Sequence, residues 1–264
     1  MIGLATLLPG SALGSTLLNV VLARAYLRKM NPKATLAVNL RKASAPARLF
    51  FEDYYRPDDS FMLMDAPVHM QRLNGLDHLL TRGTSHTELF ATPLVAAFDA
   101  WETEYALASG VARDFWEHIE PTAPGRRFDV CAHIRRGDKL TLERSLKVHS
   151  IGDYADCIER SCGKAQRGTP FDLCVVTDDH QAYVEFTRVR PTWNICTTSS
   201  PGDTGFDINA INQAGPERVR REVERMLTDY DIIRRSDLFV GTGSSNVAAI
   251  AWLLREKSAT VVLR

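Results

Sequence analysis

The sequence has no excess of charge of either sign. Its 264 residues include 32 Lys and Arg side chains and 32 Asp and Glu side chains, so the formal net charge is zero. A nucleic acid is a polyanion, and domains that bind one usually carry a clear surplus of positive charge. We therefore expect no nucleic-acid partner for this chain.

Cysteines are few, and no two of them are spaced as Cys-x-x-Cys. The chain has five cysteines, at positions 131, 157, 162, 174 and 196. An odd number without such a pair argues against both a disulfide framework and a zinc site. Cys131, Cys174 and Cys196 fall in short apolar runs, where a free cysteine behaves as a small core residue. We expect the cytoplasm or another reducing compartment.

The chain also lacks a long uninterrupted apolar segment. The apolar start, from Ile2 to Ala25, is broken by Pro9-Gly10-Ser11, and no basic residue precedes it. A membrane span needs about 20 consecutive apolar residues, and a signal peptide begins with positive charge. We interpret this start as folded structure, with neither a signal peptide nor a membrane span.

What the sequence does contain is an alternation of strand-like and helical patterns. It predicts parallel Rossmann-like sheets in an α/β protein. A segment rich in Pro and Gly at 121–127 predicts a boundary between a domain at 1–122 and a domain at 128–264. Residues 41–93 give the weakest pattern, in which 61–64 is the one predicted strand. The strands are predicted at 2–8, 34–40, 61–64, 128–134, 172–177, 193–197, 237–241 and 259–263.

The most informative stretch joins an apolar run to a group of charges. Residues 128–134 read as a buried strand that ends in His133-Ile134, and Arg135-Arg136-Gly137-Asp138-Lys139 follows directly, with Glu143 beyond. Ligands of open α/β sheets bind at the carboxyl ends of the strands. Arg135 and Arg136 offer planar donor forks suited to a diphosphate, and His133 shares the face of Arg135. The alternatives are solvated charges and, for Arg136, an ion pair with a carboxylate such as Asp138.

This stretch resembles the first donor-binding motif of the α1,6-fucosyltransferases, the family of the N-glycan core and nodulation enzymes. Val176-Thr177-Asp178-Asp179 resembles the second motif of that family, and the segment from Asp229 to Val247 resembles the third. The resemblance extends over roughly residues 128–255 in the same order as in the family. It implies a GT-B fold, with two Rossmann-like domains facing across a cleft.

The resemblance also implies the activity. The family transfers L-fucose from GDP-fucose to a hydroxyl of a glycan acceptor, inverts the anomeric centre and needs no metal or other cofactor. The C-terminal domain would bind the nucleotide-sugar donor, and the N-terminal domain would lie on the acceptor side. Two other functions remain open: a GT-B transferase of another nucleotide sugar, with a GDP-mannose or rhamnose donor, and a catalytically silent nucleotide- or glycan-binding domain.

Several residues match donor-binding positions of the family. Arg135 would hold the β-phosphate, and Asp229 and His133 would contact the guanine, whose donor edge suits a carboxylate. Asp231 is a near competitor for Asp229, and a structural role is the alternative for either residue. Ser244 and Ser245 open a predicted helix, and the resemblance gives Ser245 a phosphate contact, although capping alone also explains a serine there.

The remaining donor-side residues carry weaker signals. Asp178 and Asp179 follow a strand, which by itself suggests Mg²⁺, but the resemblance implies hydrogen bonding or a structural role. Gly10 and Gly14 lie in a predicted strand-to-helix turn, and the family carries a glycine turn at the matching place, facing the donor. A plain connection is the alternative for this turn.

Glu143 matches the catalytic base of the family, and Lys139 matches the lysine beside it. A carboxylate at this position would take the proton of the acceptor hydroxyl. Thr141 stands where the family has a glycine, so the loop that carries Glu143 departs from the family pattern.

Overall fold

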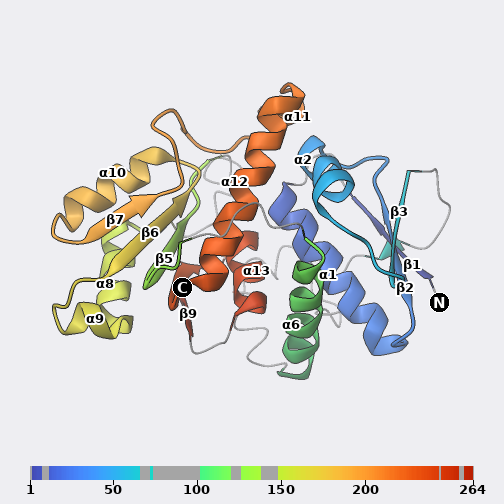
Figure 1. The fold of residues 1–264 in the computed structure, drawn as a ribbon, viewed down its shortest axis with the longest axis horizontal. Coiled ribbons are helices and arrows are strands. Elements are labelled where there is room, and N and C mark those ends of the chain that lie inside the picture. Colours follow the sequence, from blue (N-terminus) through green and yellow to red (C-terminus); the bar gives the residue numbers. More distant parts are fainter. Residues whose placement is uncertain are drawn as a thin grey trace. The chain divides into compact units, whose positions relative to one another are not determined.

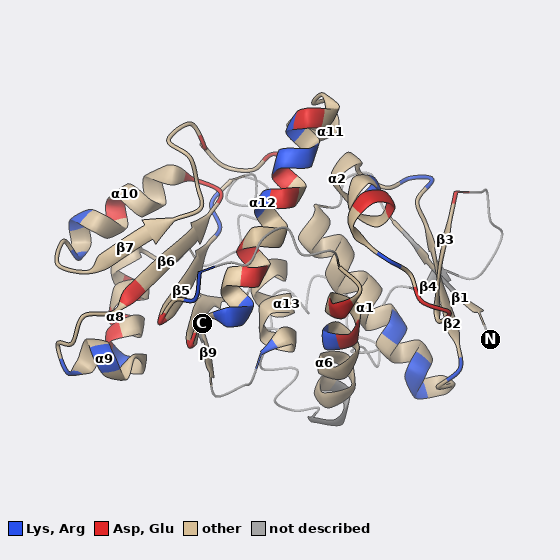
Figure 2. Cartoon of the chain, viewed as in Figure 1, with Lys and Arg blue, Asp and Glu red and all other residues tan. Residues whose placement is uncertain are grey.

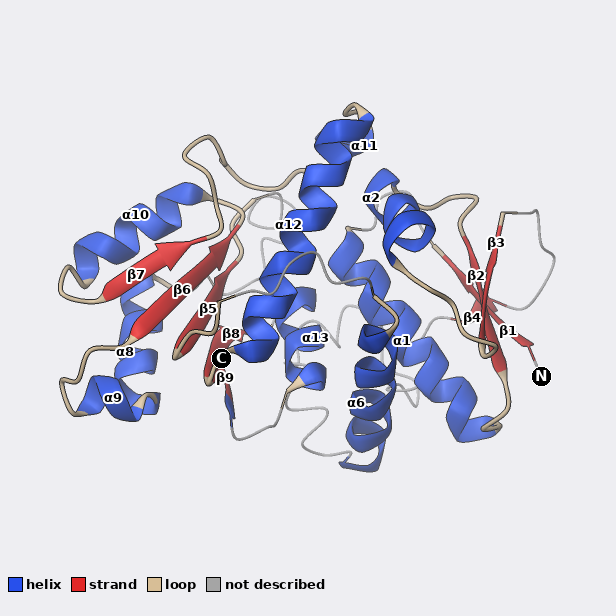
Figure 3. Cartoon of the chain, viewed as in Figure 1, coloured by secondary structure: helices blue, strands red, loops and turns tan. Residues whose placement is uncertain are grey.

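The computed structural model describes residues 2–7, 12–65, 72–73, 102–119, 126–137, 148–243, 245–255 and 259–263. The chain divides into two compact units: residues 1–121 with 208–224, and residues 122–207 with 225–264. Residues 208–224, which the sequence pattern assigns to the C-terminal domain, group with the first unit. Each unit contains a sheet whose described strand pairs are all parallel, which confirms the predicted α/β class (Figures 1 and 3).

The first unit has a sheet with strand order β3-β2-β1-β4. Its strands are β1 (Ile2–Thr6), β2 (Thr35–Asn39), β3 (Phe61–Met64) and β4 (Arg72–Leu73). The helix α1 (Leu13–Met30) connects β1 to β2 and packs against α6 (Glu102–Glu117). These bounds agree with the predicted opening of strand, helix and strand.

A part of the first unit that the sequence pattern did not predict is the segment after β2. The helix α2 (Ala45–Leu49), with Pro46 in its first turn, runs directly into a π-helical turn, η1 (Phe50–Tyr54). The ring of Tyr55 stacks on Phe115 of α6, with ring centroids 4.5 Å apart. Five aromatic residues form this part of the core: Phe50, Phe51, Tyr55, Phe61 and Phe115.

The second unit has a sheet with strand order β7-β6-β5-β8-β9. The chain runs from β5 outward to β6 and β7, and then returns to the other side of β5 with β8 and β9. The strands are β5 (Val130–Ile134), β6 (Asp172–Thr177), β7 (Asn194–Thr197), β8 (Leu238–Thr242) and β9 (Thr260–Leu263). The order therefore reverses between β5 and β8, and such a switch point is where open α/β sheets bind their ligands.

Helices precede or connect these strands. They are α8 (Ile151–Ser161), α9 (Gly163–Gln166), α10 (His180–Val189), α11 (Ile208–Asn212), α12 (Pro216–Arg235) and α13 (Asn246–Leu254). Of these, α11 and residues 216–224 of α12 belong to the first unit. No helix within the described ranges is both long enough and apolar enough to cross a membrane.

Side chains of the second sheet alternate between two buried faces. Val130, Ala132 and Ile134 of β5 pack with residues of α8 and α10, whereas Cys131 packs with residues of α12 and α13. The five strands contain a single charged residue, Asp172 at the start of β6, so the charges of this unit lie outside the strand interiors (Figure 2). Successive residues of a strand point to opposite faces. If the alternation continues past Ile134, Arg135 lies on the face of Cys131 and Arg136 on the face of Ile134.

Candidate functional site

The candidate site lies at the carboxyl edge of the second sheet and is organised around Arg135 and Asp178. Arg135 follows β5 and Asp178 follows β6, and the last residues of these strands, Ile134 and Thr177, are paired. Nη1 of Arg135 lies 2.5 Å from Oδ2 of Asp178, and the two side chains are 16% and 7% exposed. A partly buried ion pair at this edge is consistent with a binding site built on the strand ends.

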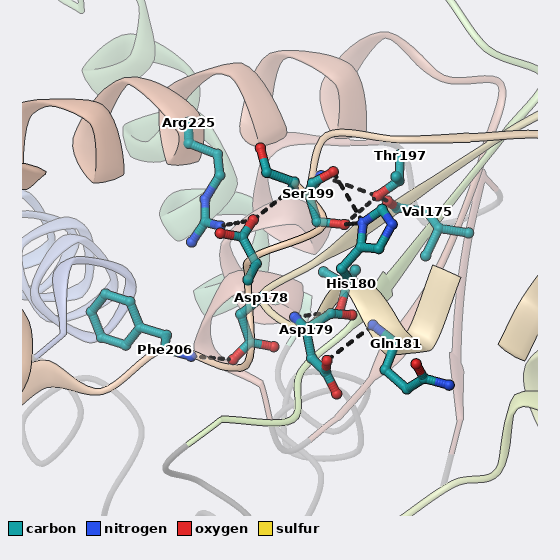
Figure 4. A network of polar contacts seen from close by, with 12 residues as sticks. Val175, Asp178, Asp179, His180, Gln181, Thr197, Ser199, Phe206 and Arg225 are labelled. Atoms are coloured by element: carbon teal, nitrogen blue, oxygen red, sulfur yellow. Dashed lines mark hydrogen bonds and ion pairs between the residues drawn. The ribbon is translucent and has the colours of Figure 1, made fainter. Parts of the chain in front are cut away.

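Two backbone groups complete the surroundings of the Asp178 carboxylate. The N–H of Arg136 donates to Oδ1 at 2.9 Å, and the N–H of Phe206 donates to Oδ2 at 3.0 Å. Figure 4 shows the latter bond and the ring of Phe206 beside it. A buried carboxylate is costly unless it is paired and hydrogen-bonded, and Asp178 satisfies both conditions.

The guanidinium of Arg135 is held from a second direction by an aromatic ring. Cζ of Arg135 lies 5.0 Å from the centroid of the Phe206 ring, within the range of a cation–π contact. An ion pair and a ring together fix the orientation of a side chain that is otherwise flexible. Arg135 is therefore a pre-oriented cation at the strand end.

Two glycines allow the loops around this pair to come close together. Gly205 has φ of +108°, and a Cβ placed on it would lie 2.6 Å from Cα of Gly137. A Cβ on Gly137 would lie 2.5 Å from Oδ2 of Asp178 and 2.6 Å from the backbone nitrogen of Phe206. Neither position has room for a side chain. The close contact with Asp178 and Phe206 therefore explains why the motif has a glycine at position 137.

Arg136 points to the other face of the sheet and is engaged there. Its guanidinium contacts Glu185 of α10 with both terminal nitrogens, at 2.9 and 2.5 Å, and Asp179 at 3.5 Å. The Glu185 carboxylate raises the pKa of the Arg136 guanidinium, and Arg136 in turn lowers the pKa of Glu185. The ion pair expected as the alternative for Arg136 therefore exists, with Glu185 as the principal partner.

Polar contacts near Asp179 connect the end of β6 to the segment after β7 (Figure 4). Oδ1 of Asp179 caps α10 by accepting from the N–H of Gln181 at 3.0 Å. Nδ1 of His180 lies 3.1 Å from Oγ of Ser199, which is also 2.9 Å from Oγ1 of Thr197. These contacts hold the segment that carries Phe206 against the strand ends.

His133 and Asp229 lie in the interior of the second unit. His133 is 5% exposed in β5, and its carbonyl accepts from the hydroxyl of Tyr154 at 3.2 Å. By the alternation along β5, its side chain shares the face of Cys131, which residues of α12 cover. Asp229 of α12 is 9% exposed, and its charge adds to burial in raising the pKa of the Cys131 thiol. Both residues thus lie on the α12 face of the sheet.

Ser245 lies at the other side of the switch point. It follows β8 and caps α13, with Oγ accepting from the N–H of Ala248 at 3.4 Å, and it is 3% exposed. Val240 of β8 is paired with Ala132 of β5, so Arg135 and Ser245 follow neighbouring strands. The start of α13 offers backbone N–H groups of the kind that bind anions.

Four predicted site residues lie outside the described residues: Gly10, Lys139, Glu143 and Ser244. Gly14 is described, but it lies in the first turn of the helix α1, which begins at Leu13. The prediction placed Gly14 in a turn before that helix. Within the described ranges, no group of three or more His, Cys, Asp or Glu side chains is arranged to hold a metal ion.

Three residues of this arrangement were not predicted: Glu185, Gly205 and Phe206. Glu185 lies at a half-buried position of a helical pattern, and Gly205 and Phe206 follow the turn residues Pro201-Gly202-Asp203. The turn itself is visible in the sequence. Its return to the end of β5 depends on packing between distant segments.

Comparison with known proteins gives a match in structure alone. No protein-family model matches the sequence, and no curated protein matches it. The crystal structure of the fucosyltransferase NodZ from Bradyrhizobium matches with a TM-score of 0.51 and 11% identity, over 96% of this chain and 93% of that chain. NodZ α-1,6-fucosyltransferase soaked with GDP-fucose matches with a TM-score of 0.48 and 11% identity, over 96% and 92%. A mutant of Arabidopsis thaliana FUT1 in complex with GDP gives 0.47 and 8%, over 96% and 69%. The first match indicates the same overall fold.

Proposed function

We propose that the chain is an inverting glycosyltransferase that moves L-fucose from GDP-fucose to a hydroxyl of a glycan acceptor. The observation that carries this proposal is the guanidinium of Arg135, which Asp178 and Phe206 orient at the carboxyl end of β5, beside the switch point. The fold shared with NodZ and the three motifs in the family's order support it.

Departure of a nucleoside diphosphate requires fixed positive charge at the leaving group. Arg135 would supply it to the β-phosphate, and Ser244, Ser245 and the start of α13 would add hydroxyl and N–H donors. Arg136 is committed to Glu185 in this structure, so we assign it the support of the loop rather than a first contact with phosphate. Asp229 and His133 would read the guanine from the α12 face of the sheet.

The reaction needs one base. The acceptor oxygen attacks the anomeric carbon, the bond from that carbon to the phosphate oxygen breaks, and GDP leaves with the bonding electrons. Glu143 would take the proton of the acceptor hydroxyl, with Lys139 beside it. Attack on the face opposite the leaving group inverts the anomeric centre, so a β-linked donor gives an α-fucoside. The proposal requires no metal and places the acceptor on the side of the N-terminal domain.

Calorimetric titration of the full chain with GDP, UDP, GDP-fucose and GDP-mannose tests the donor. A site that reads the guanine donor edge should bind GDP at least about 100-fold more tightly than UDP, since the wrong base leaves a buried carboxylate unpaired. Equal affinity for the two nucleotides would overturn the guanine assignment.

Release of GDP from GDP-fucose in the presence of a glycan panel tests the transfer. Turnover of GDP-fucose but not GDP-mannose is the expected result. Turnover of another GDP-sugar would favour the transferase of a different donor. Tight GDP binding without turnover on any acceptor would favour a nucleotide-binding domain.

A further inference from the structure

Three of the five cysteines stand side by side across the second sheet. In the strand register, Cys131 of β5 is paired with Cys174 of β6, and Cys174 is paired with Cys196 of β7. All three belong to the same packing cluster, on the face that residues of α12 and α13 cover. None of them forms a disulfide in this structure. The residues that we assign to nucleotide binding do not include these thiols.

Cys174 and Cys196 differ in their exposure to solvent. Cys174 is 1% exposed, whereas Cys196 lies in the short edge strand β7 and is half-buried. A soluble oxidant therefore meets Cys196 first, with Cys174 directly behind it in the next strand. Cys131, one strand further in, is fully buried.

The same geometry favours reactivity at Cys196. The paired Cys174 thiol lowers the pKa of Cys196 more than partial burial raises it, and the charge of Arg126 acts in the same direction. For Cys174, the paired Cys196 thiol and burial both raise the pKa. Because the thiolate is the nucleophile, we expect Cys196 to react with an oxidant and Cys174 to act as the resolving thiol.

We propose that Cys196 and Cys174 form a peroxide-sensitive dithiol, in which Cys196 is oxidised first and Cys174 resolves it as a disulfide. The Cys196 thiolate attacks one peroxide oxygen, the O–O bond breaks, and protonation gives a sulfenic acid and one water. The Cys174 sulfur then attacks the sulfenic sulfur, its proton goes to the departing hydroxide, and a second water leaves. Two thiols are oxidised and one hydrogen peroxide is reduced to two waters.

The strand spacing makes this bond attainable. Paired residues of adjacent strands lie about 4.8 Å apart, and a disulfide tolerates Cα–Cα distances of about 4.4–6.8 Å. Its Cβ atoms must approach to about 3.5–4.5 Å, so the strands must move together slightly. The sheet allows this movement, because β7 is a four-residue edge strand that pairs only with β6.

Peptide mapping after hydrogen peroxide treatment tests the proposal on the full chain. Lys and Arg residues separate all five cysteines, so each lies on its own tryptic peptide. After reduction, exposure to graded peroxide and alkylation of the remaining thiols, we expect one linked pair, between the Cys174 and Cys196 peptides, which dithiothreitol reverses. The free thiol of Cys196 should disappear about tenfold faster than that of Cys157, whose pKa is raised by burial.

Two variants separate the steps. In Cys174→Ala, Cys196 should oxidise more slowly, because the thiol that lowers its pKa is gone, and it should stop as a sulfenic acid that dimedone captures. In Cys196→Ser, Cys174 should stay reduced at peroxide concentrations that oxidise the wild type, and Cys157→Ser should behave as the wild type. A link to Cys131, random linkage among the five peptides, or loss of Cys196 no faster than Cys157 would overturn the proposal. Far-ultraviolet circular dichroism shows whether each variant has folded.

Discussion

Arg135 and Asp178 form a partly buried ion pair, 2.5 Å from Nη1 to Oδ2, between residues that follow neighbouring strands. Asp178 also accepts from the N–H groups of Arg136 and Phe206, and Phe206 places its ring over Arg135. The carboxylate thus joins the loop after β5 to the segment after β7. Any change at this pair is expected to alter both the shape of the site and its charge.

The first prediction concerns Arg135. Arg135→Ala should weaken GDP binding by about 2–4 kcal/mol, since a charge-assisted phosphate contact is lost from a partly dry site, and transfer should fall with it. Arg135→Lys should recover part of the affinity, because the charge returns without the planar fork. Titration calorimetry measures both. Asp178 keeps two backbone donors, so the variants should still fold.

Arg127→Ala is the matched control for that experiment. Arg127 is 75% exposed in the same unit and pairs with Asp237. Its loss should leave GDP affinity within about twofold, because an exposed ion pair contributes little. If Arg135→Ala bound GDP as tightly as Arg127→Ala, the diphosphate would not lie at the end of β5.

The second prediction separates the two arginines of the motif. Arg136→Ala should reduce GDP affinity much less than Arg135→Ala, because the Arg136 guanidinium contacts Glu185 and Asp179 on the opposite face. Glu185→Gln should resemble Arg136→Ala, and the double variant should add little to either single change. A double-mutant cycle on GDP affinity measures this, and equal losses at Arg135 and Arg136 would contradict the assignment.

The sequence predicted the described strands of the second unit to within about two residues, because short apolar runs bounded by turns are strong local signals. The helix α12 begins at Pro216, and proline is favoured in the first turn of a helix. The α2 and η1 segment was not predicted, because its aromatic residues have no clear strand or helix period and gain their conformation from packing around Phe115.

The site was predicted unevenly for a related reason. Arg135 and Asp178 belong to local motifs at strand ends, and parallel pairing of β5 and β6 brings them together. Phe206 lies 71 positions after Arg135, and nothing in its own neighbourhood indicates a contact with a cation. That relationship arises only when the segment after β7 folds back over β5 and β6, which composition and period cannot reveal.

The third prediction concerns the base that the family motif assigns to Glu143. Glu143→Gln keeps size and hydrogen bonding but cannot accept a proton, so transfer should fall by about 10²–10⁴-fold. GDP affinity should stay nearly unchanged, since this residue would face the acceptor. Parallel loss of GDP binding would mean that Glu143 organises the donor loop instead. Rates of GDP release and calorimetric titration of the same preparation distinguish these results.

The fourth prediction concerns pH and the ion pair of Arg24 and Asp58 in the first unit. Arg24 is 2% exposed and lies 2.9 Å from Asp58. Burial acts to raise the pKa of Asp58, but hydrogen bonds from Ser60 and Arg24 outweigh it, so the pKa is lowered. A carboxyl group with a lowered pKa stabilises the fold above its unfolded pKa of about 3.9, and this contribution is lost as pH falls through the folded value.

Asp58→Asn should therefore reduce the free energy of unfolding by about 1–3 kcal/mol at pH 7, a value that allows for the partial exposure of Asp58. The difference from wild type should shrink as pH falls below about pH 4. Urea unfolding across this range measures it. Asp59→Asn, at an exposed neighbouring position, should show no such difference. A difference that widened as pH fell below about pH 4 would mean that the folded state raises the pKa of Asp58 instead of lowering it.

The last prediction concerns the two glycines that let the loops over Asp178 meet. Gly137→Ala and Gly205→Ala should each lower the free energy of unfolding by about 1–3 kcal/mol, because a Cβ meets backbone or carboxylate atoms at 2.5–2.6 Å and Gly205 also has positive φ. Both should weaken GDP binding, since Asp178 and Phe206 orient Arg135. A Cβ added at Gly202 would have no atom within 4 Å, so Gly202→Ala should change the free energy of unfolding by less than about 0.5 kcal/mol. Urea unfolding and GDP titration of all three variants measure this. A loss of stability with unchanged GDP affinity would mean that the close approach of these loops does not contribute to nucleotide binding.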